Sequence, residues 1–169
     1  MTSRVKSNIV LIGMPGAGKS TVGVILAKHT AKHFVDTDLL IQTEEGRTLQ
    51  EILDHEGYLT LRAIEERVLL TVDLKNTVIA TGGSAAYSER AMEHLRGDGV
   101  IVFLHVEPAT LRRRVQDYET RGIARHPDQS FADLFAERDR LYRTYADVTV
   151  DADASSAEEV VERILLAIR

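Results

Sequence analysis

The chain has 169 residues, of which 44% are hydrophobic, and it carries a formal net charge of −5. This length suits one compact domain with a single core, and the acidic balance argues against a general nucleic-acid or membrane-surface binder, because such proteins carry a basic face. The absence of cysteine excludes disulfides and thiolate metal sites. The polar N-terminus and the lack of a long apolar run predict a cytoplasmic protein without a signal peptide or a membrane span.

A glycine-rich loop lies between the first predicted strand, at residues 9–12, and a predicted helix at residues 22–32. Glycines permit positive φ values, so successive backbone N–H groups can surround a polyphosphate, and the helix N-terminus adds positive charge there. The spacing is that of a phosphate-binding loop. A chance match to this spacing is expected in about one sequence in a hundred or fewer. The alternative, a glycine-rich turn that only joins the strand to the helix, is therefore disfavoured. The predicted nucleotide-binding residues here are Gly13, Gly16, Ala17, Gly18, Lys19, Ser20 and Thr21.

Two of these residues have specific predicted roles. Lys19 is expected to reach the β- and γ-phosphates, and the Ser20 hydroxyl is expected to bind Mg²⁺. Two aspartates, Asp36 and Asp38, follow the next predicted strand at residues 34–35. They would point to opposite faces if the strand geometry continued, so we predict that Asp36 faces Mg²⁺ through water and Asp38 faces a substrate hydroxyl. The alternative is an ordinary helix N-cap role for one of the aspartates or for Thr37.

Two helices are predicted next, the first opened by the capping-box spacing of Thr48 and Glu51. In the second helix an apolar stripe runs through residues 61, 64, 68 and 69. Arg62 lies off this stripe, with acidic residues three and four positions later. Periodicity alone therefore favours an exposed arginine with helical ion-pair neighbours.

The predicted strand at residues 77–80 ends in Gly82 and Gly83, which permit either a tight turn or close approach of a ligand. A helix at residues 88–97, a strand at 100–104 and a helix from Pro108 continue the alternation. The apolar periodicity then stops over residues 116–129, which predicts either a mobile lid or a surface loop.

A helix from Ser130, a strand at residues 148–150 and a helix opened by Ser156 complete the chain. Strands that alternate with helices predict an α/β fold, with a parallel sheet covered on both faces. The glycine loop, the aspartates and the Gly-Gly turn all follow strands, so they should meet at one edge of that sheet.

The order of these motifs resembles the shikimate kinases over nearly the whole chain. The matching stretches are residues 13–20, 36–38, 61–65, 82–84, 121–123 and 137–142. The resemblance implies a P-loop kinase of the nucleoside monophosphate kinase type, with a three-layer α/β/α arrangement around a five-stranded parallel sheet. It also implies a single domain in which residues 38–73 form a substrate-binding helical insertion and residues 116–129 form the lid.

The resemblance also implies roles for individual residues. Asp38 would accept hydrogen bonds from the acceptor hydroxyls and act as the base, and a guanidinium pair would hold the acceptor carboxylate. The further residues implied are Arg62 and Arg138 on the carboxylate, Gly82 and Gly83 on the acceptor ring, Arg121 on the phosphates and Arg114 beside the adenine.

Four departures from the family pattern bear on the acceptor. Ser84 replaces the third glycine of the turn, Leu61 replaces a phenylalanine, and Arg140 replaces a proline. In the lid, the stretch 121–123 has a flexible glycine where the family has a rigid proline, and the second arginine, Arg125, follows it. The lone His126 receives no role.

The sequence therefore predicts a monomeric, ATP- and Mg²⁺-dependent kinase acting on a hydroxyl of a small carboxylated acceptor. Shikimate is the leading acceptor, which would place the enzyme in aromatic amino-acid biosynthesis. No nucleic-acid or membrane partner is expected. The alternatives are a kinase of the same fold for another hydroxy acid such as gluconate, and a non-catalytic nucleotide-binding sensor.

Overall fold

The computed structural model describes residues 4–115 and 121–169, and within them five parallel strands form one sheet. The strand order is β2-β3-β1-β4-β5, and in-register partners include Val10 with Ile79 and Leu11 with Val102. Strands β1 and β3 are buried throughout and mostly apolar because both faces of the sheet are covered. The strands are β1 (Asn8–Ile12), β2 (His33–Asp36), β3 (Thr77–Ala80), β4 (Gly99–His105) and β5 (Val148–Asp151).

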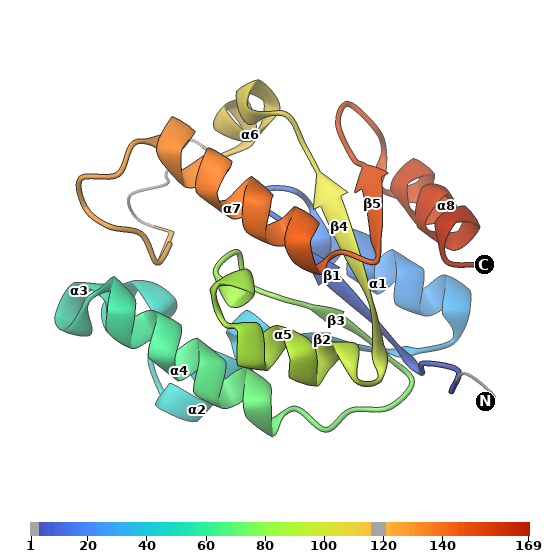
Figure 1. Cartoon of the computed structure of the whole chain (residues 1–169), viewed down its shortest axis with the longest axis horizontal. Coiled ribbons are helices and arrows are strands. Elements are labelled where there is room, and N and C mark those ends of the chain that lie inside the picture. The colour runs from blue at the N-terminus through green and yellow to red at the C-terminus, as the bar shows by residue number, and fades with distance from the viewer. Residues whose placement is uncertain (1–3, 116–120) are drawn as a thin grey trace.

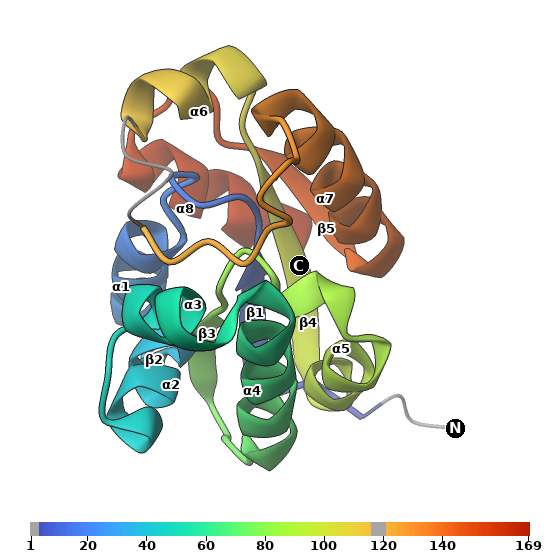
Figure 2. The same cartoon turned by 90° about the vertical axis from the view of Figure 1, so that its left-hand side faces the viewer.

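Helices cover both faces of this sheet (Figures 1 and 2). Figure 2 shows α1 and α8 on one side of the strands and α5 and α7 on the other. The predicted three-layer fold with a five-stranded parallel sheet is therefore confirmed. The helices are α1 (Lys19–Thr30), α2 (Thr37–Glu45), α3 (Leu49–Glu56), α4 (Tyr58–Thr71), η1 (Ala85–Tyr87), α5 (Glu89–Arg96), α6 (Pro108–Arg114), α7 (Phe131–Tyr145) and α8 (Ala157–Ala167). No helix in the described part of the chain is long and apolar enough to cross a membrane.

Most helix boundaries follow from capping residues that were visible in the sequence. Thr48 and Glu51 form the predicted capping box at the start of α3. The side chains of Ser88, Ser130 and Ser156 each accept a hydrogen bond from the backbone of the helix that follows. Such caps satisfy N–H groups that would otherwise lack partners, so these serines fix where the helices begin.

The expectation that strand geometry continues through residues 36–38 is wrong. Strand β2 ends at Asp36, and α2 begins at Thr37. The Asp36 carboxylate accepts a hydrogen bond from the backbone N–H of Asp38 over 2.9 Å, so Asp36 is the N-cap of α2. Both aspartates still lie at the carboxyl end of the sheet. Their relative positions follow from the start of α2 and not from the alternating geometry of a strand.

Helices α2, α3 and α4 have a small hydrophobic cluster of their own, apart from the main core. It contains Ile41, Ile52, Leu61, Val68 and Ala124. Ala124 comes from the segment after the undescribed residues, so that segment packs onto these helices. The assignment of residues 38–73 as a substrate-binding insertion stays a prediction.

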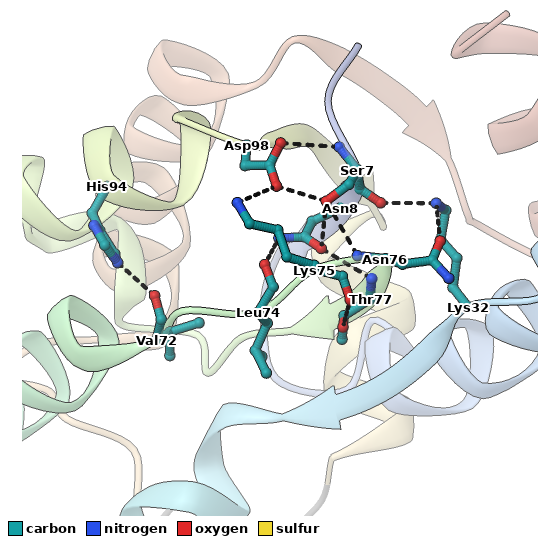
Figure 3. A network of polar contacts seen from close by, with 10 residues as sticks. All are labelled: Ser7, Asn8, Lys32, Val72, Leu74, Lys75, Asn76, Thr77, His94 and Asp98. Atoms are coloured by element: carbon teal, nitrogen blue, oxygen red, sulfur yellow. Dashed lines mark hydrogen bonds and ion pairs between the residues drawn. The ribbon is translucent and has the colours of Figure 1, made fainter. Parts of the chain in front are cut away.

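A polar network closes the opposite edge of the sheet, where the strands begin (Figure 3). The buried Asn8 side chain donates to Leu74 O over 2.7 Å and accepts from Thr77 N over 2.9 Å. At the outer side of the network, Lys75 pairs with Asp98 at 2.8 Å. The buried Asn8 side chain therefore joins β1 to the start of β3 through these two hydrogen bonds.

We expect Asn8→Leu to lower the free energy of unfolding by about 2 kcal/mol, because the buried Thr77 N–H and the partly buried Leu74 carbonyl lose their partner. Urea denaturation measures this as a lower midpoint at unchanged slope. Lys75→Ala is the matched control, since it removes only the exposed end of the same network and should leave the midpoint almost unchanged. Equal midpoints for Asn8→Leu and the unmodified chain would contradict this account.

Candidate functional site

A cavity of about 360 Å³ lies at the carboxyl ends of the strands. The loops after β1, β2 and β3 all contribute to it, which confirms that they meet at one edge of the sheet. α4, α7 and the segment 121–124 complete its wall. The predicted residues on this wall are Gly16, Gly18, Lys19, Ser20, Thr21, Asp36, Asp38, Gly82, Gly83, Arg114, Arg121 and Arg138.

The glycine-rich loop has the backbone that a phosphate cradle requires. Gly16 and Gly18 have φ values of 86° and 93°, which residues with a side chain rarely adopt. A Cβ atom on Gly13 would lie 2.8 Å from Leu104 O, so that position also requires glycine. Ala17 N donates to Met14 O over 3.1 Å and holds the turn closed.

Lys19 is held inside this loop. Its ammonium donates to Gly13 O over 2.6 Å and to Met14 O over 2.8 Å, and the residue is 8% exposed. Burial lowers the pKa of Lys19 to about 8, and Arg138 and Arg121 act in the same direction while Asp38 opposes them. A phosphate oxygen would compensate this buried charge better than two carbonyl groups do.

Ser20 and Asp36 offer oxygen atoms beside the loop. The Ser20 hydroxyl donates to the Asp36 carboxylate over 2.7 Å. Hydroxyl and carboxylate oxygens are ligands that Mg²⁺ accepts, with waters and substrate phosphates completing its six positions. The described residues contain no group of three or more histidine, cysteine or acidic side chains that could hold a metal alone. The pair therefore fits a magnesium ion that arrives with a nucleotide.

Asp38 and Glu65 converge on Gly82 at the other end of the cavity. A Cβ atom on Gly82 would contact the Asp38 carboxylate and would lie 2.8 Å from Glu65 Oε2, so only glycine leaves room for both groups. Burial raises the pKa of Asp38 to about 6, with a further contribution from Asp36. Burial also raises the pKa of Glu65 to about 7, and Asp38 adds to this shift.

Glu65 is the site residue that sequence reasoning missed. Glu65 lies on the same helix face as Leu61 and Val68, because it follows Leu61 by four residues and precedes Val68 by three. An acidic residue on this apolar stripe was the signal that Glu65 is buried and is not an exposed ion-pair partner of Arg62. Glu65 is 4% exposed, and it accepts a short hydrogen bond from the hydroxyl of Ser84. The serine that replaces the third glycine of the turn thus binds a buried carboxylate on the cavity wall.

Arg138 and Arg62 converge on a single oxygen atom. The Nη2 atoms of Arg138 and Arg62 donate to Ala124 O over 2.9 and 3.3 Å. The two Nε atoms are buried and have no hydrogen-bond partner among the described residues. Two cationic forks directed at one oxygen, each with an unused N–H, form an arrangement suited to a carboxylate.

The surroundings of Arg62 differ from those that periodicity favours. Its guanidinium is half-buried, and its carbon Cζ lies 3.5 Å from the ring centroid of Tyr87 and 5.0 Å from that of Tyr58. Arg138 lines the main cavity, whereas Arg62 lines two other cavities. The expectation of an exposed arginine with helical ion pairs is wrong, because these aromatic rings and the carbonyl occupy the guanidinium.

The described part of the predicted lid packs against α3. Gly122 has a φ value of 71°, and its N–H donates to Gln50 Oε1 over 2.6 Å. A Cβ atom there would lie 2.7 Å from Leu49 Cβ, so the glycine serves close packing as well as backbone freedom. Ile123 and Ala124 are buried behind it. The remaining predicted lid residues, 116–120, lie outside the described part of the chain.

The basic residues around the lid occupy different positions. Arg121 is exposed and lines the main cavity. Arg125 instead donates to Gln129 O over 2.8 Å within its own loop. His126 accepts from Asp128 N over 3.1 Å and stacks edge-on against Tyr58. Arg114, at the end of α6, donates to Gly16 O over 3.3 Å and thus lies beside the glycine loop.

Comparison with known proteins identifies the family of this chain. The sequence model described as shikimate kinase matches residues 15–169. Shikimate kinase 2 of Enterobacter sp. (strain 638) is 39% identical over 166 residues, which cover 95% of each chain. The structure of shikimate kinase from Acinetobacter baumannii in complex with shikimate has a TM-score of 0.85 and 32% identity, and the match covers 95% of this chain and 91% of that chain. The chain therefore belongs to the shikimate kinase family of P-loop, ATP-dependent phosphotransferases.

Proposed function

We propose that this chain transfers the γ-phosphoryl group of ATP to a hydroxyl of shikimate, forming shikimate 3-phosphate for aromatic amino-acid biosynthesis. The observation that carries the proposal is a single cavity lined both by the glycine-rich loop and by Asp38, Glu65 and Arg138. The shikimate bound to the Acinetobacter baumannii relative supports this choice of acceptor.

The loop end of the cavity would hold the nucleotide. Backbone N–H groups of residues 13–20, except Pro15, would surround the phosphates, and Lys19 would move its hydrogen bonds from the loop carbonyls to phosphate oxygens. Arg121 is exposed at the cavity wall and would compensate the charge that spreads over the transferring group, while Arg114 would lie near the adenine. Ser20 and Asp36 would hold Mg²⁺, which neutralises phosphate charge when bound.

The other end of the cavity would hold the acceptor. Arg138 and Arg62 would bind its carboxylate, and the backbone of Gly82 and Gly83 would contact its ring. Asp38 accepts the proton of the attacking hydroxyl as the new oxygen–phosphorus bond forms and the bond from the γ-phosphorus to the leaving ADP oxygen breaks. The raised pKa of Asp38, about 6, leaves it ionised at neutral pH yet basic enough to take part in the transfer.

The buried acidic groups weigh against a sensor, whereas the arginine pair narrows the acceptor only to carboxylated compounds. A sensor that only binds nucleotide has no use for buried acidic groups beyond the phosphates, and burying them costs stability. A paired-arginine site favours a carboxylated acceptor, which gluconate also satisfies, so acceptor selection needs experiment. We further propose a cytoplasmic monomer without nucleic-acid or membrane partners, supported by the net charge of −5 and the absence of cysteine.

ADP release with Mg·ATP tests the proposal on a panel of shikimate, quinate, gluconate, homoserine and nucleoside monophosphates. We expect turnover on shikimate and little on the others. Lys19→Ala serves as the blank, because loss of the charge on the phosphates should lower turnover by about a hundredfold or more without unfolding the protein. ATP binding without turnover on shikimate would overturn the choice of acceptor, and full activity of Lys19→Ala would overturn the assigned role of the loop.

Arg62→Ala should raise the KM for shikimate by about tenfold to a hundredfold, because a charge-assisted hydrogen bond to the carboxylate is lost. The KM for ATP should change far less. The matched control is Arg67→Ala on the same helix, since Arg67 is exposed and pairs with Glu44 and Glu45. Equal acceptor KM values for Arg62→Ala and Arg67→Ala would return Arg62 to a structural role.

The pH dependence of kcat/KM should have two limbs. As the pH falls through about 6, Asp38 takes up a proton and no longer accepts one from the hydroxyl, so kcat/KM for shikimate should fall. As the pH rises through about 8, unliganded Lys19 loses its proton and kcat/KM for ATP should fall. Initial rates measured below pH 6, between pH 6 and 8, and above pH 8 check the direction of both changes. An acid limb near the ordinary aspartate pKa of about 4 would contradict the burial of Asp38.

A further inference from the structure

Tyr87 contacts both arginines of the acceptor end. It belongs to η1, which follows the turn of Gly82 and Gly83. The Cζ atoms of Arg62 and Arg138 lie 3.5 and 5.5 Å from the Tyr87 ring centroid, within the range of a cation–π interaction. Tyr87 is absent from the described lining of the main cavity, so any effect on the acceptor must act through the arginines.

The two guanidinium groups repel each other, yet both donate to the Ala124 carbonyl. The electron-rich face of the Tyr87 ring offsets part of this repulsion. The negative charge of Glu137 also offsets the repulsion between the arginines. Glu137 is held near Tyr87, because the Tyr87 hydroxyl donates to Glu137 Oε1 over 2.6 Å. The second oxygen of Glu137 accepts from Gln129 Nε2 over 3.1 Å, so the same group reaches the last residue of the predicted lid.

These contacts hold the Arg62 guanidinium in one orientation. One Nη atom is committed to Ala124 O, and the face of the guanidinium lies against the ring. The buried Nε has no hydrogen-bond partner among the described residues, and the same is true of Arg138 Nε. A guanidinium fixed in this way loses less conformational entropy when it binds a carboxylate than a free one does.

We propose that Tyr87 is a positioning residue that holds Arg62 and Arg138 together as one carboxylate-binding pair. The inference rests on the proposed function, because it assigns the acceptor carboxylate to these two arginines. Tyr87 would set acceptor affinity without touching the acceptor or the nucleotide.

Steady-state kinetics of Tyr87→Leu and Tyr87→Phe test this role. Tyr87→Leu should raise the acceptor KM by about tenfold, with kcat and the KM for ATP nearly unchanged, because the ring face is lost. Tyr87→Phe keeps the ring and should restore most of the affinity. The matched control is Tyr145→Leu, which removes a ring 6.0 Å from Arg96, outside the site, and should leave the acceptor KM unchanged. If Tyr87→Leu does not fold, Tyr87→Met carries the same expectation.

An unchanged or lowered acceptor KM in Tyr87→Leu would overturn the inference, as would equal losses in Tyr87→Phe and Tyr87→Leu. So would a rise in both KM values together with a lower melting temperature, which indicates a purely structural role. The unmodified chain separates this failure from that of the proposed function. If it phosphorylates shikimate and Arg62→Ala raises the KM while Tyr87→Leu does not, only the role of Tyr87 fails.

Discussion

The arrangement of the site depends on charge that is buried away from water. Lys19 and Arg138 are 8% and 1% exposed, and Glu65 on the same cavity wall is 4% exposed. Removing such groups from water is costly unless opposite charges and hydrogen bonds compensate them. The sheet makes this possible, because parallel strands bring three loops to one edge and hold the charges at fixed distances. The raised carboxylate pKa values and the lowered lysine pKa follow from the same burial.

The Ala124 carbonyl connects Arg62 and Arg138 to the described part of the predicted lid. This oxygen receives one hydrogen bond from Arg138 and one from Arg62, and the Ala124 side chain packs in the small cluster of α2, α3 and α4. A change in the position of this segment therefore changes the surroundings of both arginines. The proposed roles of both arginines and of Tyr87 in acceptor binding therefore depend on one set of contacts.

Most of the fold could be predicted from the sequence because its signals are local. Apolar runs marked the five strands, and serine and threonine caps marked several helix starts. The phosphate-binding loop was predictable because its glycines and lysine have a fixed spacing. The start of α2 was missed, since Asp36 could end a strand or cap a helix until tertiary structure decided between them. Glu65 was missed because its burial depends on contacts between α4 and the turn of Gly82 and Ser84. The spacing of apolar residues within one helix does not reveal such contacts.

The central claim is that one cavity places an acceptor hydroxyl beside Asp38 and its carboxylate beside an arginine pair. A crystal structure of the chain with shikimate and ADP would test it most directly. The account predicts that Arg138 and Arg62 donate to the carboxylate and that an Asp38 oxygen lies within hydrogen-bond distance of the hydroxyl nearest the phosphates. Shikimate bound with its carboxylate toward Lys19, or with Arg62 bonded only to Ala124 O, would contradict the account.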